Sequence, residues 1–254
     1  MGVKVTEREG ALAAVAERPR RHRRSNHYPR FTPDDWQPMP PRPASFYLEF
    51  REVDVIRTQE LSRSVLEIVM HPKDVVPVLQ RAHVDYVLLG LYGIMGWMKE
   101  PRVTQDVDVL VAKKHLKRAL EAICKVFPHL KLHDTPVVVR FFEQDKAVLD
   151  IMKPHHALFV EALKSATERQ LWNLKVRVPV LEMALTLKFF SMTSPGRKEE
   201  DKHQDAHDFI HLVKSNTNAD LSKLRVWGEL AYSGGGMDLV KMVEDVRAGR
   251  KLEI

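Results

Sequence analysis

The chain has 254 residues, enough for one large domain or two small ones, and a hydrophobic fraction of 44% is sufficient for a packed core. A formal net charge of +6 favours anionic partners such as nucleotides or nucleic acid. The single cysteine, Cys124, excludes an internal disulfide, fits a reducing cytoplasmic setting, and sits in an apolar run that predicts a buried position. No apolar stretch reaches the roughly 20 residues that a membrane span needs, so no membrane partner is expected.

Residues 1–45 are biased in composition. Arginines cluster between Arg18 and Arg24, and prolines recur from Pro29 to Pro43. Few apolar residues recur there at any period and prolines remove backbone donors, so the entropy of ordering is not offset. We expect a disordered basic arm. Its arginines either contact nucleic-acid phosphates or form a solvated tail.

From residue 46 onward, apolar residues recur at helical and strand periods. The first predicted elements are helices near residues 65–69 and 72–82, a strand over 86–89, a helix over 91–98, a strand over 107–111, a helix over 113–127, and a strand pair over 137–142 and 147–152. The later ones are a helix over 156–165, a strand over 175–178, and helices over 181–191, 200–213 and 237–250.

This order of elements predicts an α+β fold, in which a small mixed sheet is flanked by helices and followed by a C-terminal helical part. We expect three regions: the arm over residues 1–45, a core over 46–192 and a helical region over 193–254.

Acidic residues interrupt two of the apolar strands. Asp106 and Asp108 are two residues apart, which places both carboxylates on one face of a strand, and Asp150 interrupts the strand over 147–152. Buried like charges are costly unless a cation compensates, and Mg²⁺ prefers oxygen ligands. The pattern favours a metal site; the alternative is an exposed strand end, with Asp150 paired to a lysine or arginine.

The motifs around these acids resemble a known family. The segments 86–90 and 101–111 are similar to the signature of the DNA polymerase β-like nucleotidyltransferase superfamily. Within it, the minimal and AbiEii-type toxin branch resembles the chain further in one motif that runs from residues 178–182 through 187–188, and again at residues 202–208. The similarity extends over about residues 75–213, with four short motifs in the same order.

The resemblance implies the activity and the roles of several residues. It implies an enzyme that moves an NMP from an NTP to an acceptor hydroxyl of RNA or protein. Two Mg²⁺ ions, or Mn²⁺, would be held by Asp106 and Asp108, with Asp150 helping to hold the ion that activates the hydroxyl. Gly90 would admit the nucleotide phosphates to the backbone, and Lys188 would contact the triphosphate.

Further residues of the nucleotide site follow from the same resemblance. Arg102 and Thr104 precede the acidic pair, and Asp205 lies on an acid-rich helix that adjoins the nucleotide pocket in similar proteins. The branch also implies a toxin–antitoxin system with an antitoxin protein as partner. Where the family has Gly-Gly or Gly-Ser, this chain has Gly90-Leu91, so Leu91 can offer only its amide. This motivates a second hypothesis, a catalytically silent nucleotide- or RNA-binding module on the same fold.

Three histidines, His203, His207 and His211, recur every four residues and would form one stripe on a helix. Such a stripe can bind zinc, but a solvated helix face is the commoner outcome.

Overall fold

The computed structural model describes residues 70–252, all of which belong to one structural unit. The expected arm over residues 1–45 and the helix near 65–69 lie outside the described residues. The two predicted domain boundaries, after residue 45 and after residue 192, stay predictions.

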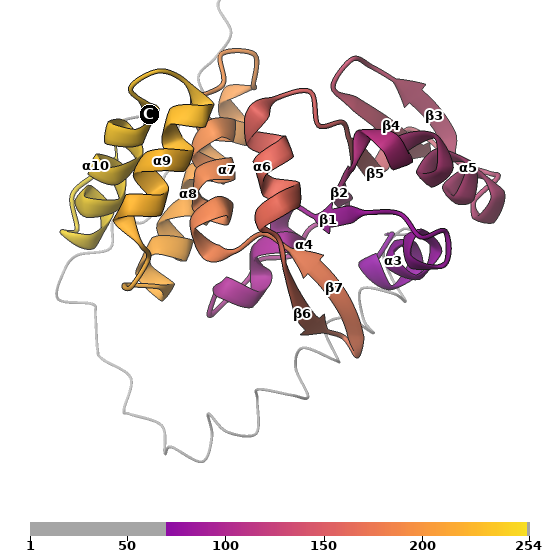
Figure 1. Cartoon of the computed structure of the whole chain (residues 1–254), viewed down its shortest axis with the longest axis horizontal. Helices are drawn as coiled ribbons and strands as arrows, with labels where there is room; N and C mark the ends of the chain where they lie inside the picture. Colours follow the sequence, from indigo (N-terminus) through magenta and orange to yellow (C-terminus); the bar gives the residue numbers. More distant parts are fainter. Residues whose placement is uncertain (1–69, 253–254) are drawn as a thin grey trace, which may run out of the picture. The chain divides into compact units, whose positions relative to one another are not determined.

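The first part of the described chain holds the strands of a sheet and the helices that connect them (Figure 1). These elements are α3 (Pro72–Arg81), β1 (Tyr86–Leu88), α4 (Gly90–Ile94), the 3₁₀ turn η2 (Met95–Trp97), β2 (Val107–Val111), the 3₁₀ turn η3 (Lys113–His115), α5 (Leu116–Val126), β3 (Lys131–Asp134), β4 (Val138–Glu143) and β5 (Lys146–Met152). Local sequence explains where α3 begins, because the His71 side chain and the Asp74 side chain each cap a backbone amide of its first turn.

The five strands form one mixed sheet in the order β1-β2-β5-β4-β3. Strands β2 and β5 run parallel, and the other neighbouring pairs are antiparallel. The parallel pair places Asp108 directly beside Asp150. The pairing therefore brings together two acids that lie far apart in the sequence.

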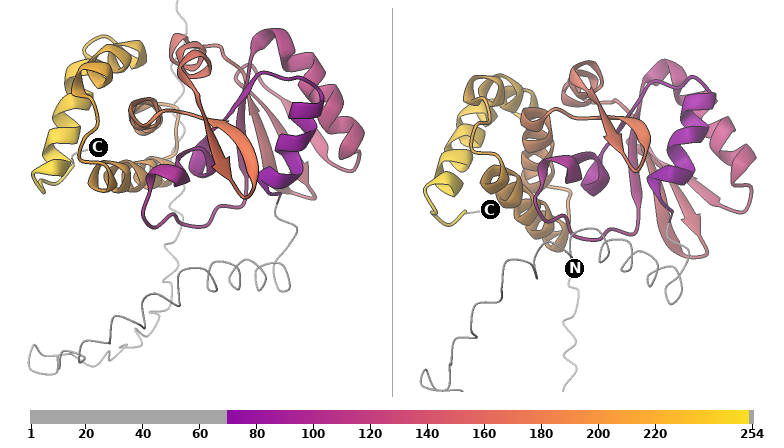
Figure 2. Two further views of the ribbon diagram at one scale, coloured as in Figure 1. Left: turned by 60° about the horizontal axis from the view of Figure 1, so that its bottom comes forward. Right: turned by 90° about the horizontal axis from the view of Figure 1, so that it is seen from below.

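One face of the sheet packs against α3 and α5 (Figure 2). Val109 and Ile151 point to this side, where they meet Leu79 of α3 and Ile123 of α5 in one apolar cluster. Because side chains alternate along a strand, Asp108 and Asp150 point to the opposite face.

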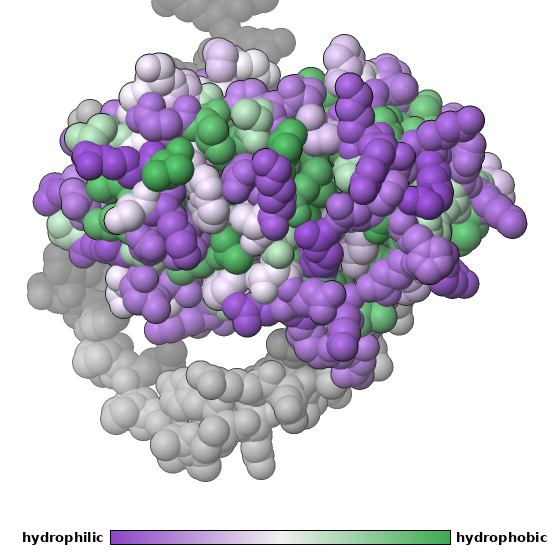
Figure 3. Space-filling model, in the orientation of Figure 1, coloured by the Kyte–Doolittle hydropathy of each residue, from purple (hydrophilic) through white to green (hydrophobic). Residues whose placement is uncertain are grey.

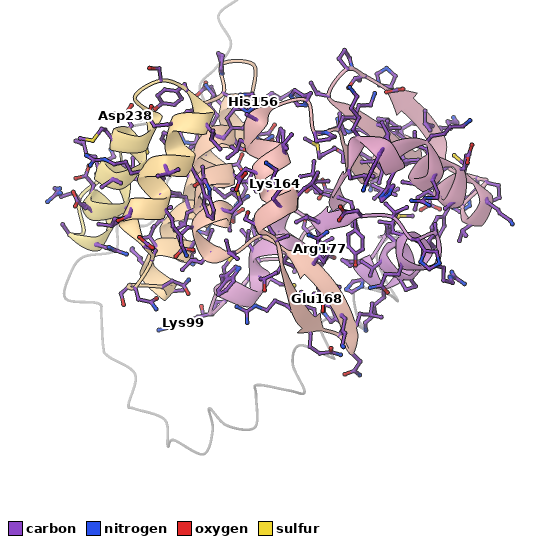
Figure 4. The ribbon with its side chains drawn as sticks, viewed as in Figure 1. Lys99, His156, Lys164, Glu168, Arg177 and Asp238 are labelled. Atoms are coloured by element: carbon purple, nitrogen blue, oxygen red, sulfur yellow. The ribbon has the colours of Figure 1, made fainter. Side chains whose placement is uncertain are left out.

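The rest of the described chain is a hairpin between helices. Its elements are α6 (Ala157–Ser165), β6 (Thr167–Leu171), β7 (Leu174–Val178), α7 (Leu181–Thr193), α8 (Glu199–Ser215), α9 (Leu221–Ala231) and α10 (Gly235–Arg247). Helices α7 to α10 share a second apolar cluster, and α6 and α7 pack against β1 and β2 in a third. Arg177, at the base of the β6–β7 hairpin, pairs with Asp85 and donates to the carbonyl of Leu163, so it ties the hairpin to the sheet and to α6 (Figure 4).

The predicted α+β class, with its mixed sheet and C-terminal helical part, is confirmed. Three elements were not predicted. All four residues of β3 are exposed and β6 is largely polar, so neither strand has the apolar alternation by which strands are recognised. Helix α9 contains Gly228, a residue that disfavours helix interiors, but here it lets α9 approach the backbone of Gly235 closely.

The expectation that Cys124 is buried is wrong, because its side chain is exposed. The buried positions of α5 are Ala119 and Ile123, and Cys124 is turned about 100° away from Ile123 around the helix. Between residues 70 and 252, no helix combines the length and the apolar character needed to cross a membrane.

Glycine at position 93 is required where α4 crosses the end of β1. A Cβ at Gly93 would lie 2.3 Å from the carbonyl oxygen of Leu88, whereas the nearest atom to a Cβ at the exposed Gly96 is 4.0 Å away. We expect Gly93→Ala to lower the free energy of unfolding by about 1–3 kcal/mol, because the backbone must shift. Gly96→Ala should change it by less than about 0.5 kcal/mol. Urea denaturation measures both, and equal effects would contradict this packing.

Candidate active site

Three carboxylates meet on the sheet face opposite α3 and α5. Asp108 on β2 and Asp150 on β5 are register partners, and Asp106 immediately precedes β2. Thr104 donates its hydroxyl to Asp106 Oδ1 at 2.7 Å, which orients this carboxylate. The structure thus brings together the three acids that the sequence singled out.

Arg140 on β4 holds the third carboxylate with both ends of its guanidinium fork. Its Nε donates to Asp150 Oδ1 at 2.8 Å and its Nη2 donates to Asp150 Oδ2 at 2.6 Å. The hydrogen bonds and the charge of Asp150 raise the pKa of Arg140. A lysine or arginine partner of Asp150 was left open as an alternative from the sequence, but Arg140 itself was not singled out, because its place opposite Asp150 depends on the register of the strand pair.

The carboxyl group of Asp108 is perturbed by its surroundings. Burial is the main cause that raises its pKa to about 7, and the charges of Asp106 and Asp150 add to the shift, while Lys188 and Arg197 oppose it. Within residues 70–252, the Asp108 carboxylate makes no hydrogen bond or ion pair, unlike Asp106 and Asp150. Ionised Asp108 therefore lacks a partner of opposite charge.

A divalent cation suits this arrangement. Asp106 and Asp108 supply carboxylate oxygens, the ligands that Mg²⁺ and Mn²⁺ prefer, and Mg²⁺ commonly takes only one or two carboxylates together with waters and substrate phosphates. Asp150 is a weaker candidate ligand in this conformation, because Arg140 occupies both of its oxygens. In keeping with this, the described residues contain no preformed group of three or more metal-ligating side chains. The residues fit an ion held by two carboxylates and completed by a substrate.

Gly90 has a structural role that the sequence did not indicate. Its φ of +56° is in the left-handed region, and a Cβ at this position would lie 2.0 Å from Asp108 Oδ2. Glycine is therefore needed to leave room for the carboxylate of Asp108. The Leu91 side chain is buried and packs with Phe189 in the helical cluster, so it anchors α4 to the C-terminal helices.

A charged network forms the wall opposite the carboxylates. Lys188 on α7 donates to Asp205 Oδ1 at 2.8 Å and to Asp208 Oδ2 at 2.7 Å, both on α8. Arg102, in the segment before β2, donates through Nε to Asp208 Oδ1 at 3.1 Å and through Nη2 to Asp208 Oδ2 at 3.2 Å. Arg197 Nε lies 2.5 Å from Asp205 Oδ2. The network thus ties the segment that carries Thr104 and Asp106 to α7 and α8.

The charges of this wall balance. Its three cations, Lys188, Arg102 and Arg197, face Asp205 and Asp208, and Asp201 on the same helix α8 also lines the cleft. Burial alone would raise the pKa of Asp208, but the hydrogen bonds from Arg102 and Lys188 and their charges hold it below its usual range. Asp208 belongs to the motif over residues 202–208 that was singled out in the sequence, but only the tertiary fold places it between these cations.

Asp205 retains an acceptor inside the cleft. Its Oδ2 is buried without a hydrogen bond, since the nearby Arg197 makes an ion pair by distance but not with the geometry of a hydrogen bond. Both walls, and the residues predicted to bind nucleotide, line one cleft of about 450 Å³. The lining includes Gly90, Leu91, Arg102, Thr104, Lys188 and Asp205 together with Asp106, Asp108, Asp150 and Arg140.

A larger cavity of about 700 Å³ lies between α7, α8 and α10. Its acids are engaged by neighbours: Asp245 pairs with Lys241 and Arg250, and Asp238 accepts a hydrogen bond from Tyr232. The unpartnered carboxylate lies in the smaller cleft, so the smaller cleft is the better candidate site.

The histidine stripe on α8 does not form a metal site in the described part of the chain. The ring centroids of His207 and His211 lie 4.3 Å apart on α8. The zinc alternative is therefore not supported.

Comparison with solved structures finds similar folds among nucleotidyltransferases. An antigenic nucleotidyltransferase-like protein from Paracoccidioides brasiliensis has a TM-score of 0.46 at 18% identity, over 70% of this chain and 91% of that one. The lincosamide antibiotic adenylyltransferase LnuA, bound to lincomycin, has a TM-score of 0.42 at 16% identity, over 57% of this chain and 99% of that one. The antibiotic-resistance factor ANT(2'')-Ia has a TM-score of 0.45 at 12% identity, over 70% and 95%.

No protein-family model matches the chain, and no curated protein matches it. The likeness to the solved structures concerns the fold alone. The roles of individual residues rest on the geometry of the cleft.

The raised pKa of Asp108 makes stability depend on pH. Because its folded pKa of about 7 is above the unfolded value of 3.8, the folded state binds more protons between these values, and stability falls as pH rises through this range. We expect Asp108→Asn to become progressively more stable than wild type between about pH 4 and 7 in the presence of a chelator. Urea denaturation at pH 5 and pH 8 measures the difference.

Asp145→Asn, in the exposed turn between β4 and β5, is the matched control and should follow wild type at both pH values. A difference between wild type and Asp108→Asn that is the same at pH 5 and pH 8 would show that Asp108 is not desolvated as described.

Proposed function

We propose that the chain is a metal-dependent nucleotidyltransferase that moves an NMP from an NTP to an acceptor hydroxyl of RNA or protein. The observation that carries the proposal is the pairing of Asp108 with Asp150 beside Asp106, opposite a wall that holds Lys188, Arg102 and Arg197 within one cleft. A cleft with carboxylates that can hold a metal and with cations across from them matches a substrate that arrives as a metal-bound triphosphate.

Each wall has a separate task in this proposal. Asp106 and Asp108 hold the divalent ion, Mg²⁺ or Mn²⁺, with room for two ions if Asp150 is released by Arg140. When bound, the ion would neutralise charge on the phosphates and favour the ionised form of the attacking hydroxyl. Lys188 and its neighbours attract the triphosphate electrostatically.

The network also orients the reacting groups. Arg102 fixes the segment before β2 to the buried Asp208, and Thr104 in that segment orients Asp106. The acceptor oxygen would attack the α-phosphorus while pyrophosphate departs. Placing these groups before the reaction lowers its barrier, because they need not reorganise during the step.

The order of the sequence motifs supports a narrower proposal, that the protein is a cytoplasmic toxin of the AbiEii type, with an antitoxin protein as partner. The single cysteine agrees with a reducing compartment. The antitoxin would be a further macromolecular partner beside the NTP and the acceptor.

A second candidate function is a catalytically silent nucleotide- or RNA-binding module. Two observations favour it: Leu91 is buried where the family has a second glycine or a serine, and Arg140 holds both oxygens of Asp150. The two functions differ in one consequence, because a silent module would bind its ligand without needing Asp106 and Asp108.

A transfer assay with labelled NTPs, total RNA and protein acceptors tests the activity. We expect a product that requires Mg²⁺ or Mn²⁺, and a loss of at least about 100-fold in Asp106→Asn, because a developing charge loses its stabilising partner. Asp145→Asn is the control, since it removes an exposed carboxylate outside the cleft. No metal-dependent product, or undiminished product from Asp106→Asn, would exclude this enzyme.

A further inference from the structure

The sheet face that carries Asp108 and Asp150 is covered along only part of its width. At β2, Leu110 points to this face and packs against Leu158 of α6. Arg140 on β4 and Lys131 and His133 on β3 are exposed. Within residues 70–252, this side of β4 and β3 is therefore open. In the view of Figure 3, in which α5 lies in front of these strands, the surface at this end of the molecule is largely hydrophilic.

On the open part of the face, basic side chains lie in register with the acids Asp108 and Asp150. In register across the sheet, Asp108 pairs with Asp150, Asp150 with Arg140, and Arg140 with His133. Cross-strand partners have Cβ atoms about 5 Å apart on the same side, so these four side chains form one line. The line changes from acidic inside the cleft to basic at the edge of the sheet.

Arg140 is held in a position that suits an anion. Its Nε and Nη2 donate to Asp150, which fixes the plane of the guanidinium, while its Nη1 makes no hydrogen bond to any residue from 70 to 252. The side chain is 44% exposed. A guanidinium has five N–H donors, so a phosphate can bind the free edge while Asp150 keeps the other edge. An anionic group on the acceptor would thus bind next to Asp150.

Lys131 and His133 extend this property along β3. Neither side chain makes a hydrogen bond or ion pair with the described part of the chain, and both are exposed. They lie on the same side of the strand, about 7 Å apart. Phe142, the register partner of Lys131, lies on the same side of β4 as Arg140 and is partly exposed. Basic groups beside an aromatic ring are the combination that binds single strands through phosphates and stacked bases.

We propose that the open sheet face, formed by Lys131, His133, Arg140 and Phe142, binds the phosphodiester backbone of a single-stranded nucleic acid. The end of that strand enters the cleft at Asp150, where its terminal hydroxyl is the acceptor. This inference rests on the proposed nucleotidyl transfer and names the acceptor class for it. The charge order of the line favours nucleic acid, since the hydroxyl end meets the acids and the phosphates meet the bases.

Binding without an NTP tests the open sheet face separately from transfer. The probe is a labelled single-stranded RNA of twelve nucleotides with mixed sequence, measured by fluorescence anisotropy with the full chain. We expect Lys131→Glu to weaken binding about tenfold or more, and Lys131→Ala to reduce the dependence of log K on log salt by about 1. Lys125→Glu is the matched control, because Lys125 is exposed on α5, across the sheet, and should change binding by less than about twofold.

Three results would overturn the proposal: no RNA binding, equal effects of Lys131→Glu and Lys125→Glu, or tighter binding of an acidic peptide of the same length than of RNA. Thermal melting of both variants confirms that they fold. If RNA binding depends on Lys131 but no metal-dependent transfer is found, the open sheet face is a binding site and the proposed nucleotidyl transfer is contradicted. If transfer to RNA occurs but Lys131→Glu leaves RNA affinity unchanged, the acceptor site lies elsewhere.

Discussion

Burial of Asp108 beside two further acids is the constraint around which the cleft is arranged. The parallel pairing of β2 and β5 forces Asp108 beside Asp150, and Asp106 follows from the same strand period. Burial makes the ionised form of Asp108 costly, the two neighbouring carboxylates add to that cost, and the pKa of Asp108 rises to about 7. Gly90 adds to the constraint, because only a residue without a Cβ leaves space for the Asp108 side chain. A site of this kind becomes stable when a cation enters it.

The negative charges of the cleft are compensated in two different ways. Arg140 neutralises Asp150, and its two hydrogen bonds fix the orientation of the Asp150 carboxylate. Asp108 has no such partner among the described residues. Across the cleft, Lys188 is divided between two aspartates, which orders α7 against α8 and keeps the cation at a set position. Aspartates on α8 offset the cations of that wall, so a triphosphate would need the metal as well as the wall for firm binding.

The acids of the cleft could be predicted from sequence because they break an apolar strand pattern. Asp106, Asp108 and Asp150 are conspicuous for that reason, and the alternation of β2 is enough to place two of them together. The class of fold followed from the order of the elements. In contrast, β3 has no buried position, so no apolar signal marks it.

The partners of these acids could not be predicted in the same way. Arg140 requires the register of β4 with β5, and Asp208 requires the packing of α8 on α7 and on the segment before β2. The open sheet face depends on β3, a strand without an apolar signal, so it too becomes visible only in the fold. The local sequence pattern therefore reveals which acidic residues are costly to bury. The tertiary structure reveals which side chains compensate the charges of those residues.

Metal-dependent binding of a non-hydrolysable NTP is the measurement that tests the central account most directly, because it requires no acceptor. Titration calorimetry with α,β-methylene analogues of the four NTPs should show binding that is at least about tenfold tighter with Mg²⁺ than with chelator, and this gain should disappear in Asp108→Asn. Binding that is equally tight without Mg²⁺, or that is unchanged in Asp108→Asn, would contradict the account and favour the silent module.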